Sequence, residues 1–279
     1  MPGRTIIITG ASDGIGAAAA RRLTAAGEEV VVVGRSRAKT TAVADELGAA
    51  WFLADFAQLD SVRELARDLR AAYPRIDVLA NNAGGLMGDR EVTADGFEKT
   101  LQVNHLAPFL LTNLLLDILT ASHATVLNTS SVAAQRFGHL DLEDLGNARG
   151  YSPTKAYGDG KLANVLFTRE LHHRFHDAGI STAAFHPGNV ATSFASDTTS
   201  VLRFVYHTPL KRLVLISPER GAEDLVWLAT ATPGTDWVSG GYYAKKQLTR
   251  TNKQADDADL ARGLWDRSAE MVGSPAPSI

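Results

Sequence analysis

The sequence predicts a doubly wound α/β fold, a mainly parallel sheet of about seven strands with helices on both faces. Short β-branched segments alternate with longer segments rich in Ala, Leu and Arg, as in a series of βαβ units. The strand-like segments are continuously apolar, which is typical of a parallel sheet covered on both sides. A glycine-rich turn follows the first of them. We expect a single domain over residues 1–273 and a flexible tail over 274–279.

Six segments are predicted to be strands, and the segments between them have apolar residues at helical spacing. The predicted strands are residues 5–9, 30–33, 51–54, 77–81, 125–129 and 181–185. Gly27, Gly48 and Gly179 are expected to end three of the helices. Residues 193–217 follow the sixth strand and are less regular, so we interpret them as a substrate lid. A surface insertion is the alternative.

The bulk properties exclude several classes of protein. The chain has 279 residues, a formal net charge of -3 and no cysteine. This small charge gives no reason to expect nucleic acid or an anionic membrane as a partner. The sequence shows no signal peptide and no apolar run long enough to span a bilayer. Since a chain without cysteine fits a reducing compartment, we expect a cytoplasmic protein.

The segment TGASDGIG at residues 9–16 joins the first predicted strand to the first predicted helix. Glycines in such a turn let backbone N–H groups and the helix N-terminus approach a pyrophosphate, so the turn predicts a dinucleotide cofactor. Its place in a βαβ series makes this prediction stronger than the glycine spacing alone. The expected contacts are Gly10, Ser12, Asp13, Gly14, Ile15 and Gly16.

The end of the second strand bears on the choice between NAD and NADP. An acidic residue about 20 positions after the glycines would bind the adenosine ribose and repel a 2′-phosphate. Here the segment reads VVVGRSR, with Arg35 and Arg37 and no acid. A guanidinium fits a phosphate, so we favour NADP, with NAD possible. Asp13 adds an opposing charge, and the two arginines could instead cap a solvated helix.

Two more strand ends are expected to face the cofactor. Asp55, with Phe56 beside it, follows the third strand, where the carboxylate can accept a hydrogen bond from the adenine amino group. The stretch NNAG at residues 81–84 ends the fourth strand. Its residues Asn82, Ala83 and Gly84 suit a chain that passes close to the ribose. Taken alone, NNAG also fits an ordinary turn after a strand.

The segment YSPTKAYGDGK contains the spacing Y-x-x-x-K twice, as Tyr151 with Lys155 and as Tyr157 with Lys161. Serine and proline at 152–153 are a helix-start signature, so Tyr151 precedes the helix. Tyr157 and Lys161 lie inside the helix, four residues apart and on one face. We therefore predict that Tyr157 and Lys161 are the chemical pair.

This pair suits the reduction of a carbonyl group. Hydride transfer leaves an alkoxide that needs a proton, and an ammonium beside Tyr157 would lower the pKa of its phenol toward neutrality. Ser131 is expected to orient the carbonyl oxygen, with Ser130 as the alternative. Gly158 and Gly160 cost helix propensity of about 1 kcal/mol each, which we attribute to a cofactor lying close to this face.

These motifs, in this order, resemble the short-chain dehydrogenase/reductase family, over roughly residues 4–272. The stretches LQVNHLAPFLLTNLLLDIL, AYGDGKLANVLFTRELHHRF and ARGLWDRSAEMVG resemble its retinol-dehydrogenase-like subgroup, which includes the WW-domain oxidoreductases. The resemblance implies a Rossmann fold and a tetrad of Asn104, Ser131, Tyr157 and Lys161. In it, the Asn104 backbone holds a water of the proton relay, and Lys161 also binds the nicotinamide ribose.

The resemblance also implies nicotinamide contacts in HPGNVAT, residues 186–192. The expected contacts are Pro187, Gly188, Val190 and Thr192. Pro108 departs from the family pattern and should kink its helix or remove a hydrogen bond.

His172 and His176 are spaced like a metal pair, but no second ligand set is apparent, so we predict no metal site.

We therefore expect an NADP-dependent oxidoreductase, a ketoreductase-like enzyme, for a carbonyl or secondary alcohol of a fairly apolar small molecule. Family members are often dimers or tetramers, so a homodimer or homotetramer is possible. A non-catalytic dinucleotide-binding sensor or scaffold is the alternative, although it would not need the tyrosine and lysine. An extended-type sugar-nucleotide epimerase would need a G-x-x-G-x-x-G turn that this sequence does not have.

Overall fold

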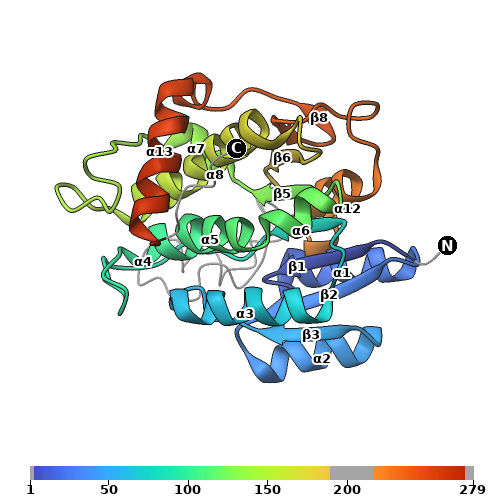
Figure 1. Ribbon diagram of the computed structural model, residues 1–279. Coiled ribbons are helices and arrows are strands. Elements are labelled where there is room, and N and C mark those ends of the chain that lie inside the picture. Colours follow the sequence, from blue (N-terminus) through green and yellow to red (C-terminus); the bar gives the residue numbers. More distant parts are fainter. Residues whose placement is uncertain (1–2, 189–215, 274–279) are drawn as a thin grey trace.

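A computed structural model describes residues 3–188 and 216–273, in which eight strands form one sheet (Figure 1). The strand order is β3-β2-β1-β4-β5-β6-β7-β8, and every neighbouring pair is parallel except β7 with β8. The chain runs outward from β1 to β3 and then returns to place β4 beside β1. This boundary is the switch point of a doubly wound sheet, where ligands of such folds bind.

The six predicted strands are confirmed to within a residue or so at their ends, and two more strands follow them. The strands are β1 (Thr5–Thr9), β2 (Glu29–Gly34), β3 (Ala50–Leu53), β4 (Val78–Asn81), β5 (Thr125–Thr129), β6 (Ser181–Phe185), β7 (Gly241–Ala244) and β8 (Gln247–Leu248). The expected number of about seven strands therefore becomes eight, because the short β8 adds an antiparallel edge.

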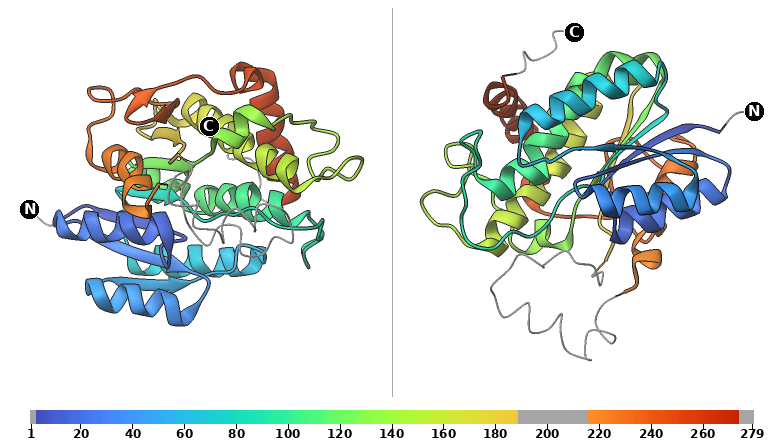
Figure 2. Two further views of the ribbon diagram at one scale, coloured as in Figure 1. Left: turned by 180° about the vertical axis from the view of Figure 1, so that it is seen from behind. Right: turned by 90° about the horizontal axis from the view of Figure 1, so that it is seen from below.

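Helices cover both faces of the sheet, as Figure 2 shows from below. They are α1 (Gly14–Ala25), α2 (Arg37–Leu47), α3 (Leu59–Ala72), α4 (Lys99–Leu101), α5 (Ala107–Leu114), α6 (Leu116–Ala121), α7 (Val132–Arg136), α8 (Pro153–Phe175), α11 (Pro218–Gly221), α12 (Glu223–Thr230) and α13 (Ala258–Met271), with the π-turn η1 (Gln102–Leu106) and the 3-10 turn η3 (Lys253–Asp256).

The two faces of the sheet carry two separate cores. Ile7 of β1 packs into the core formed with α3, α5, α8 and α13, whereas its neighbours Ile6 and Ile8 pack into the core formed with α1 and α12. All three side chains are fully buried. A buried isoleucine contributes about 1.5–3 kcal/mol, so both cores fix the position of β1 and of the turn that follows it.

Two of the glycines expected to end helices do so closely. Gly27, with φ +88°, follows the C-cap residue Ala26 of α1, and Gly48, with φ +61°, is the C-cap of α2. Gly179, with φ +104°, lies beyond the short turn that follows the end of α8 at Phe175.

Pro108 disturbs the helical path, as expected, although α5 itself continues from it. Pro108 is the second residue of α5 and directly follows the π-turn η1. It has no N–H to donate to the carbonyl of Asn104, four residues earlier. Its own carbonyl accepts a hydrogen bond from the Thr112 hydroxyl at 2.8 Å.

Two expected segments, the lid and the tail, extend beyond the described residues. Residues 193–215 of the proposed lid and the tail at 274–279 lie outside them, so the lid and the tail stay predictions. Within the described ranges, the helices are too short or too polar to cross a membrane. The cytoplasmic location also stays a prediction.

Candidate functional site

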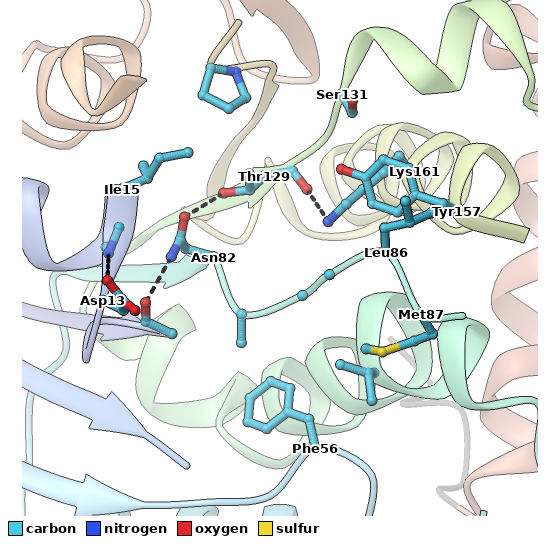
Figure 3. Close-up of a pocket in the computed structure, with 18 of the residues that line it drawn as sticks. Asp13, Ile15, Phe56, Asn82, Leu86, Met87, Thr129, Ser131, Tyr157 and Lys161 are labelled. Carbon is cyan, nitrogen blue, oxygen red and sulfur yellow. Dashed lines mark hydrogen bonds between the residues drawn. The ribbon is translucent and has the colours of Figure 1, made fainter. Parts of the chain in front are cut away.

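A cavity of about 650 Å³ lies at the carboxyl edge of the sheet, and the chain enters it after each of the first six strands (Figure 3). Parallel strands direct their carboxyl ends to one edge, so residues far apart in sequence meet there. Lining residues within two positions of the ends of β1 to β6 include Gly10, Arg35, Asp55, Asn82, Ser131 and Pro187.

The glycine turn packs closely against the end of β4. A Cβ at Gly10, whose φ is +66°, would lie 2.8 Å from the Cα of Ala83. A Cβ at Gly16 would lie 2.3 Å from the Gly10 carbonyl oxygen. Larger residues at either position would push the turn away from β4 and change the floor of the cavity.

Asp13, the acidic residue that opposed the choice of NADP, caps α1. Its carboxylate accepts a hydrogen bond from Gly14 N, and its carbonyl accepts one from Ala17 N. The N–H groups of Ile15 and Gly16 have no acceptor within the described residues, as is usual in a first helical turn. Two backbone donors are thus available to an anion in the cavity, beside which Ser12 also lies.

The two arginines after β2 have different surroundings. Arg35 lines the cavity and is exposed, whereas the Arg37 guanidinium lies 5.3 Å from the centroid of the Trp51 ring. Lys39 also lines the cavity, and its Nζ lies 2.9 Å from the Asp13 carboxylate. At the end of β2 the described lining of the cavity therefore has two cations, Arg35 and Lys39, where the sequence suggested only arginine.

Asp55 and Phe56 lie together at the end of β3 and both line the cavity. The Asp55 carboxylate accepts a hydrogen bond from Ala57 N at 3.0 Å, which fixes its orientation. Phe56 is buried, and its carbonyl accepts a hydrogen bond from the Gln102 amide.

Asn82 connects the glycine turn to β5. Its Nδ2 donates to the carbonyls of Thr9 and Gly10, and its Oδ1 accepts from the Thr129 hydroxyl at 3.3 Å (Figure 3). The Thr9 hydroxyl in turn accepts hydrogen bonds from the N–H groups of Asn82 and Ala83. The polar side chain of Asn82 therefore holds the turn in place.

Tyr157 and Lys161 come from α8 and both line the cavity. Lys161 is only 2% exposed; its Nζ donates to the Thr129 carbonyl at 3.2 Å and lies 5.6 Å from the centroid of the Tyr157 ring. Burial lowers the pKa of Lys161 to about 7. This lysine can therefore change charge near neutral pH.

The two candidate serines have different hydrogen bonds. Ser131 caps α7, and its Oγ accepts from Ala133 N at 3.1 Å, so its own O–H remains able to donate. Ser130 is buried and donates its O–H to the Lys161 carbonyl at 2.7 Å. The geometry thus favours Ser131 over Ser130 as the donor to a bound carbonyl.

The other tyrosine and lysine do not line this cavity. The Tyr151 hydroxyl donates to the Gly88 carbonyl at 2.9 Å, and Lys155 Nζ lies 2.6 Å from the Asp159 carboxylate.

The explanation given above for Gly158 and Gly160 is wrong, because neither residue lines the cavity. A Cβ at Gly158 would lie 2.8 Å from Gly138 N, and one at Gly160 would lie 3.2 Å from the Asn104 Cβ. The two glycines therefore make room for neighbouring chain segments and not for a cofactor.

Asn104 lies in η1, behind the loop that follows β4. Its side chain donates to the carbonyls of Gly85 and Thr100, both at 2.9 Å, and accepts from Gly85 N. A Cβ at Gly84 would meet both the Asn104 Oδ1, at 2.5 Å, and the Lys161 Nζ, at 2.9 Å. Asn104 thus lies next to Lys161 with only Gly84 between them.

The segment after β6 is described as far as Gly188. Pro187 and Gly188 line the cavity, and Gly188 N donates to His186 Nδ1 at 2.9 Å. Val190 and Thr192 lie outside the described residues.

The histidines on α8 have nearby hydrogen-bond partners. The rings of His172 and His176 are 4.5 Å apart between centroids. Their Nδ1 atoms lie within hydrogen-bond distance of the Ser239 hydroxyl and the Ile180 carbonyl, respectively.

Several lining residues were not anticipated from the sequence. Lys39 lies four residues after Arg35, in the first turn of α2. A second group of unanticipated residues lies near Ser131 and Tyr157 and gave no recognisable sequence pattern. They are Leu86, Met87, Val103, Val132, Ala133, Arg136, Phe137 and Thr154.

Known proteins of similar sequence identify the family of this chain. A family model described as short chain dehydrogenase matches residues 4–202. A Streptomyces sp. (strain C5) protein named "Putative daunorubicin C-13 ketoreductase DnrU" is 44% identical, over 99% of this chain and 95% of its own. Human retinol dehydrogenase 13 is 38% identical, over 100% of this chain and 87% of its own.

Solved structures show the same relationship. An uncharacterized protein from Mycobacterium paratuberculosis has a TM-score of 0.79 and 32% identity, over 99% of this chain and 95% of its own. The Pseudomonas aeruginosa RhlG/NADP active-site complex has a TM-score of 0.70 and 25% identity, over 87% and 94%. The chain therefore belongs to the short-chain dehydrogenase/reductase family, in its retinol-dehydrogenase-like subgroup, and is an oxidoreductase of the alcohol and carbonyl type.

Proposed function

We propose that this protein is an NADP-dependent oxidoreductase that uses Tyr157 as general acid and base on a carbonyl or secondary alcohol of a fairly apolar small molecule. The observation that carries the proposal is a single cavity, lined by the glycine turn at one end and by Tyr157 with Lys161 at the other. The glycine turn suits the binding of a dinucleotide, and Tyr157 with Lys161 suits proton transfer.

The residues of the cavity fit such a cofactor. The N–H groups of Ile15 and Gly16 suit the pyrophosphate, and Asp55 with Phe56 suits the adenine. Pro187 and Gly188 would contact the nicotinamide, and Lys161 its ribose. When bound, the cofactor supplies or accepts the hydride.

The protein itself then has to position the substrate oxygen and move one proton. In the reducing direction, the Ser131 hydroxyl donates a hydrogen bond to the carbonyl oxygen. As the hydride reaches the carbonyl carbon, the Tyr157 hydroxyl gives its proton to the oxygen, which yields the alcohol and a phenolate. Lys161 stabilises that phenolate in its ammonium form. The proton is restored to Tyr157 from solvent, through a water that the Asn104 backbone would hold.

The preference for NADP depends on charge at the end of β2. Arg35 is an exposed guanidinium that lines the cavity, and the Lys39 ammonium lies beside it. Because Lys39 also pairs with Asp13, the acidic residue of the turn does not oppose a 2′-phosphate. The NADP complex of the Pseudomonas aeruginosa relative supports the same choice.

Calorimetric titration with NADPH and with NADH tests which of the two cofactors the protein prefers. We expect NADPH to bind at least about tenfold more tightly than NADH, since a charge-assisted contact to phosphate is strong. Arg35→Asp should abolish that preference. Arg37→Asp changes the charge of the same loop by the same amount, but Arg37 packs on Trp51 and should change the preference little. Equal effects of the two variants would contradict the proposed role of Arg35.

Oxidation of NADPH with a panel of apolar ketones and aldehydes tests the reaction. The Streptomyces relative is named a ketoreductase and the human relative a retinol dehydrogenase, so both aromatic ketones and polyene aldehydes belong in the panel. Tight nucleotide binding without turnover of any of them would favour a sensor or scaffold.

A further inference from the structure

The end of the cavity beyond Tyr157 has a largely apolar wall. Leu86, Ala133 and Tyr157 are buried against one another. Met87 and Val103 line the same cavity, and Phe137, also a lining residue, is 49% exposed. A ketone held at Tyr157 would therefore extend along hydrocarbon and aromatic surface.

Among the described residues, Arg136 is the charged side chain that lines this end beyond Ser131 and Tyr157. It is the last residue of α7, four residues after Val132 and three after Ala133, so all three lie on the same face of the helix. The Arg136 side chain is exposed, and among the described residues it has no hydrogen bond or ion pair.

The charges that line the cavity are distributed unevenly. Its two carboxylates, Asp13 and Asp55, both lie in the cofactor half, where Lys39 pairs with the first and Ala57 N binds the second. The substrate half has the cations Arg136 and Lys161 and, among the described residues, no carboxylate in its lining. This half therefore attracts negative charge.

From these features we propose that the substrate is an apolar ketone, or the matching secondary alcohol, that carries an anionic group, and that Arg136 binds this group. The inference rests on the proposed function and adds the substrate class. A guanidinium binds a carboxylate through two parallel hydrogen bonds, which makes it more selective than an apolar wall alone.

Ser131 is the N-cap of α7 and Arg136 is its last residue, so the two polar groups lie at opposite ends of this short helix. The carbonyl and the anionic group of the substrate are therefore expected to lie several bonds apart. Because an arginine side chain is long and has several rotatable bonds, substrates of more than one chain length can reach both groups.

A series of methyl ketones that end in a carboxylate, compared with their methyl esters, tests this substrate class. We expect the acids that reach both groups to exceed their esters by about tenfold in kcat/KM, mostly through KM. Arg136→Gln should bring the ratio of acid to ester close to one, and Arg136→Lys should keep part of it. Arg35→Gln removes the same charge as Arg136→Gln, but at the cofactor end of the cavity. It should leave the ratio of acid to ester unchanged.

The outcomes separate the two proposals. If esters and acids are reduced equally well, or if the preference for acids survives in Arg136→Gln, the role of Arg136 is wrong while the proposed function stands. If neither is reduced, the proposed reaction fails. Calorimetry of octanoate against octanol then still measures anion binding without turnover. Octanoate should bind more tightly than octanol to the unaltered protein, and Arg136→Gln should abolish the difference; its persistence would overturn the inference.

Discussion

The two tyrosine–lysine pairs of the segment 151–161 have the same spacing and opposite surroundings. Tyr151 precedes α8 and its hydroxyl binds the Gly88 carbonyl, while Lys155 binds the carboxylate of Asp159. Tyr157 and Lys161 lie within α8 and face the cavity. The position of each pair relative to the helix start, and not the spacing, decides which of them can act on a substrate.

The two lysines also differ in their electrostatic surroundings. Lys155 is partly exposed and pairs with the buried Asp159, which also accepts hydrogen bonds from Asn147 and His139 N. Lys161 is buried, and within the described residues its ammonium contacts the Thr129 carbonyl and no carboxylate. Lys155 therefore holds a loop in place, whereas burial keeps the pKa of Lys161 near 7. A lysine held in this way is typical of functional sites.

The largest effect should come from removing the phenol at 157. Tyr157→Phe takes away the proton donor, so kcat should fall by roughly 10²–10⁴-fold while NADPH binding is retained. Steady-state kinetics and calorimetry on the same preparation measure both. A variant that keeps more than a tenth of the activity would assign the proton transfer to another group.

Lys161→Met should change how stability depends on pH. The folded protein holds the pKa of Lys161 at about 7, against 10.5 for an ordinary lysine. Between these values the unfolded chain binds more protons, so the free energy of unfolding rises with pH, and the full penalty of burial applies below about pH 7. Lys161→Met should therefore be more stable than the unaltered protein at about pH 6, by a few kcal/mol.

That gain should shrink steadily as the pH is raised toward 10. Urea unfolding at several pH values measures it. A difference between the two proteins that stays constant with pH would show that the pKa of Lys161 is not depressed.

Asp159→Ala should destabilise the fold by about 2–4 kcal/mol, because a buried carboxylate that pairs with Lys155 and accepts two further hydrogen bonds is lost. The His139 N–H and the Asn147 side-chain amide would lose their acceptor, whereas Lys155 would keep the His139 carbonyl and the Asn147 Oδ1. Asp256→Ala, which removes an exposed partner of Arg169, is the control and should cost less than about 1 kcal/mol. Urea midpoints compare the two; similar losses would mean that Asp159 is not a buried anchor.

Tyr151→Phe should have the smallest effect. Burial raises the pKa of Tyr151, so its phenol stays protonated and donates a hydrogen bond to the Gly88 carbonyl. We expect a loss of about 1 kcal/mol in stability and less than a twofold change in kcat. If Tyr151→Phe instead abolishes turnover, the assignment of the two pairs must be reversed.

The sequence predicts most of the fold because six strands are continuous aliphatic or β-branched segments. The strand β7, GYYA, contains a glycine and two tyrosines and gives no such signal, although its Tyr242 and Tyr243 are buried. Residues 137–138 pass close to α8 at Gly158, and no local sequence pattern reveals this contact. The sequence therefore suggested a cofactor, and not a neighbouring chain segment, as the reason for the glycine. Arg136 was missed for the same reason, since its role depends on which wall of the cavity α7 forms.

Thr129 has a consequence for how this enzyme unfolds. Its hydroxyl meets Asn82, 47 residues earlier, and its carbonyl meets Lys161 and Asn164, 32 and 35 residues later. Thr129 thus ties the nucleotide half to the chemical half at the centre of the sheet. Loss of β5 from the sheet would release both sets of contacts together, so activity and cooperative tertiary structure should disappear in a single transition.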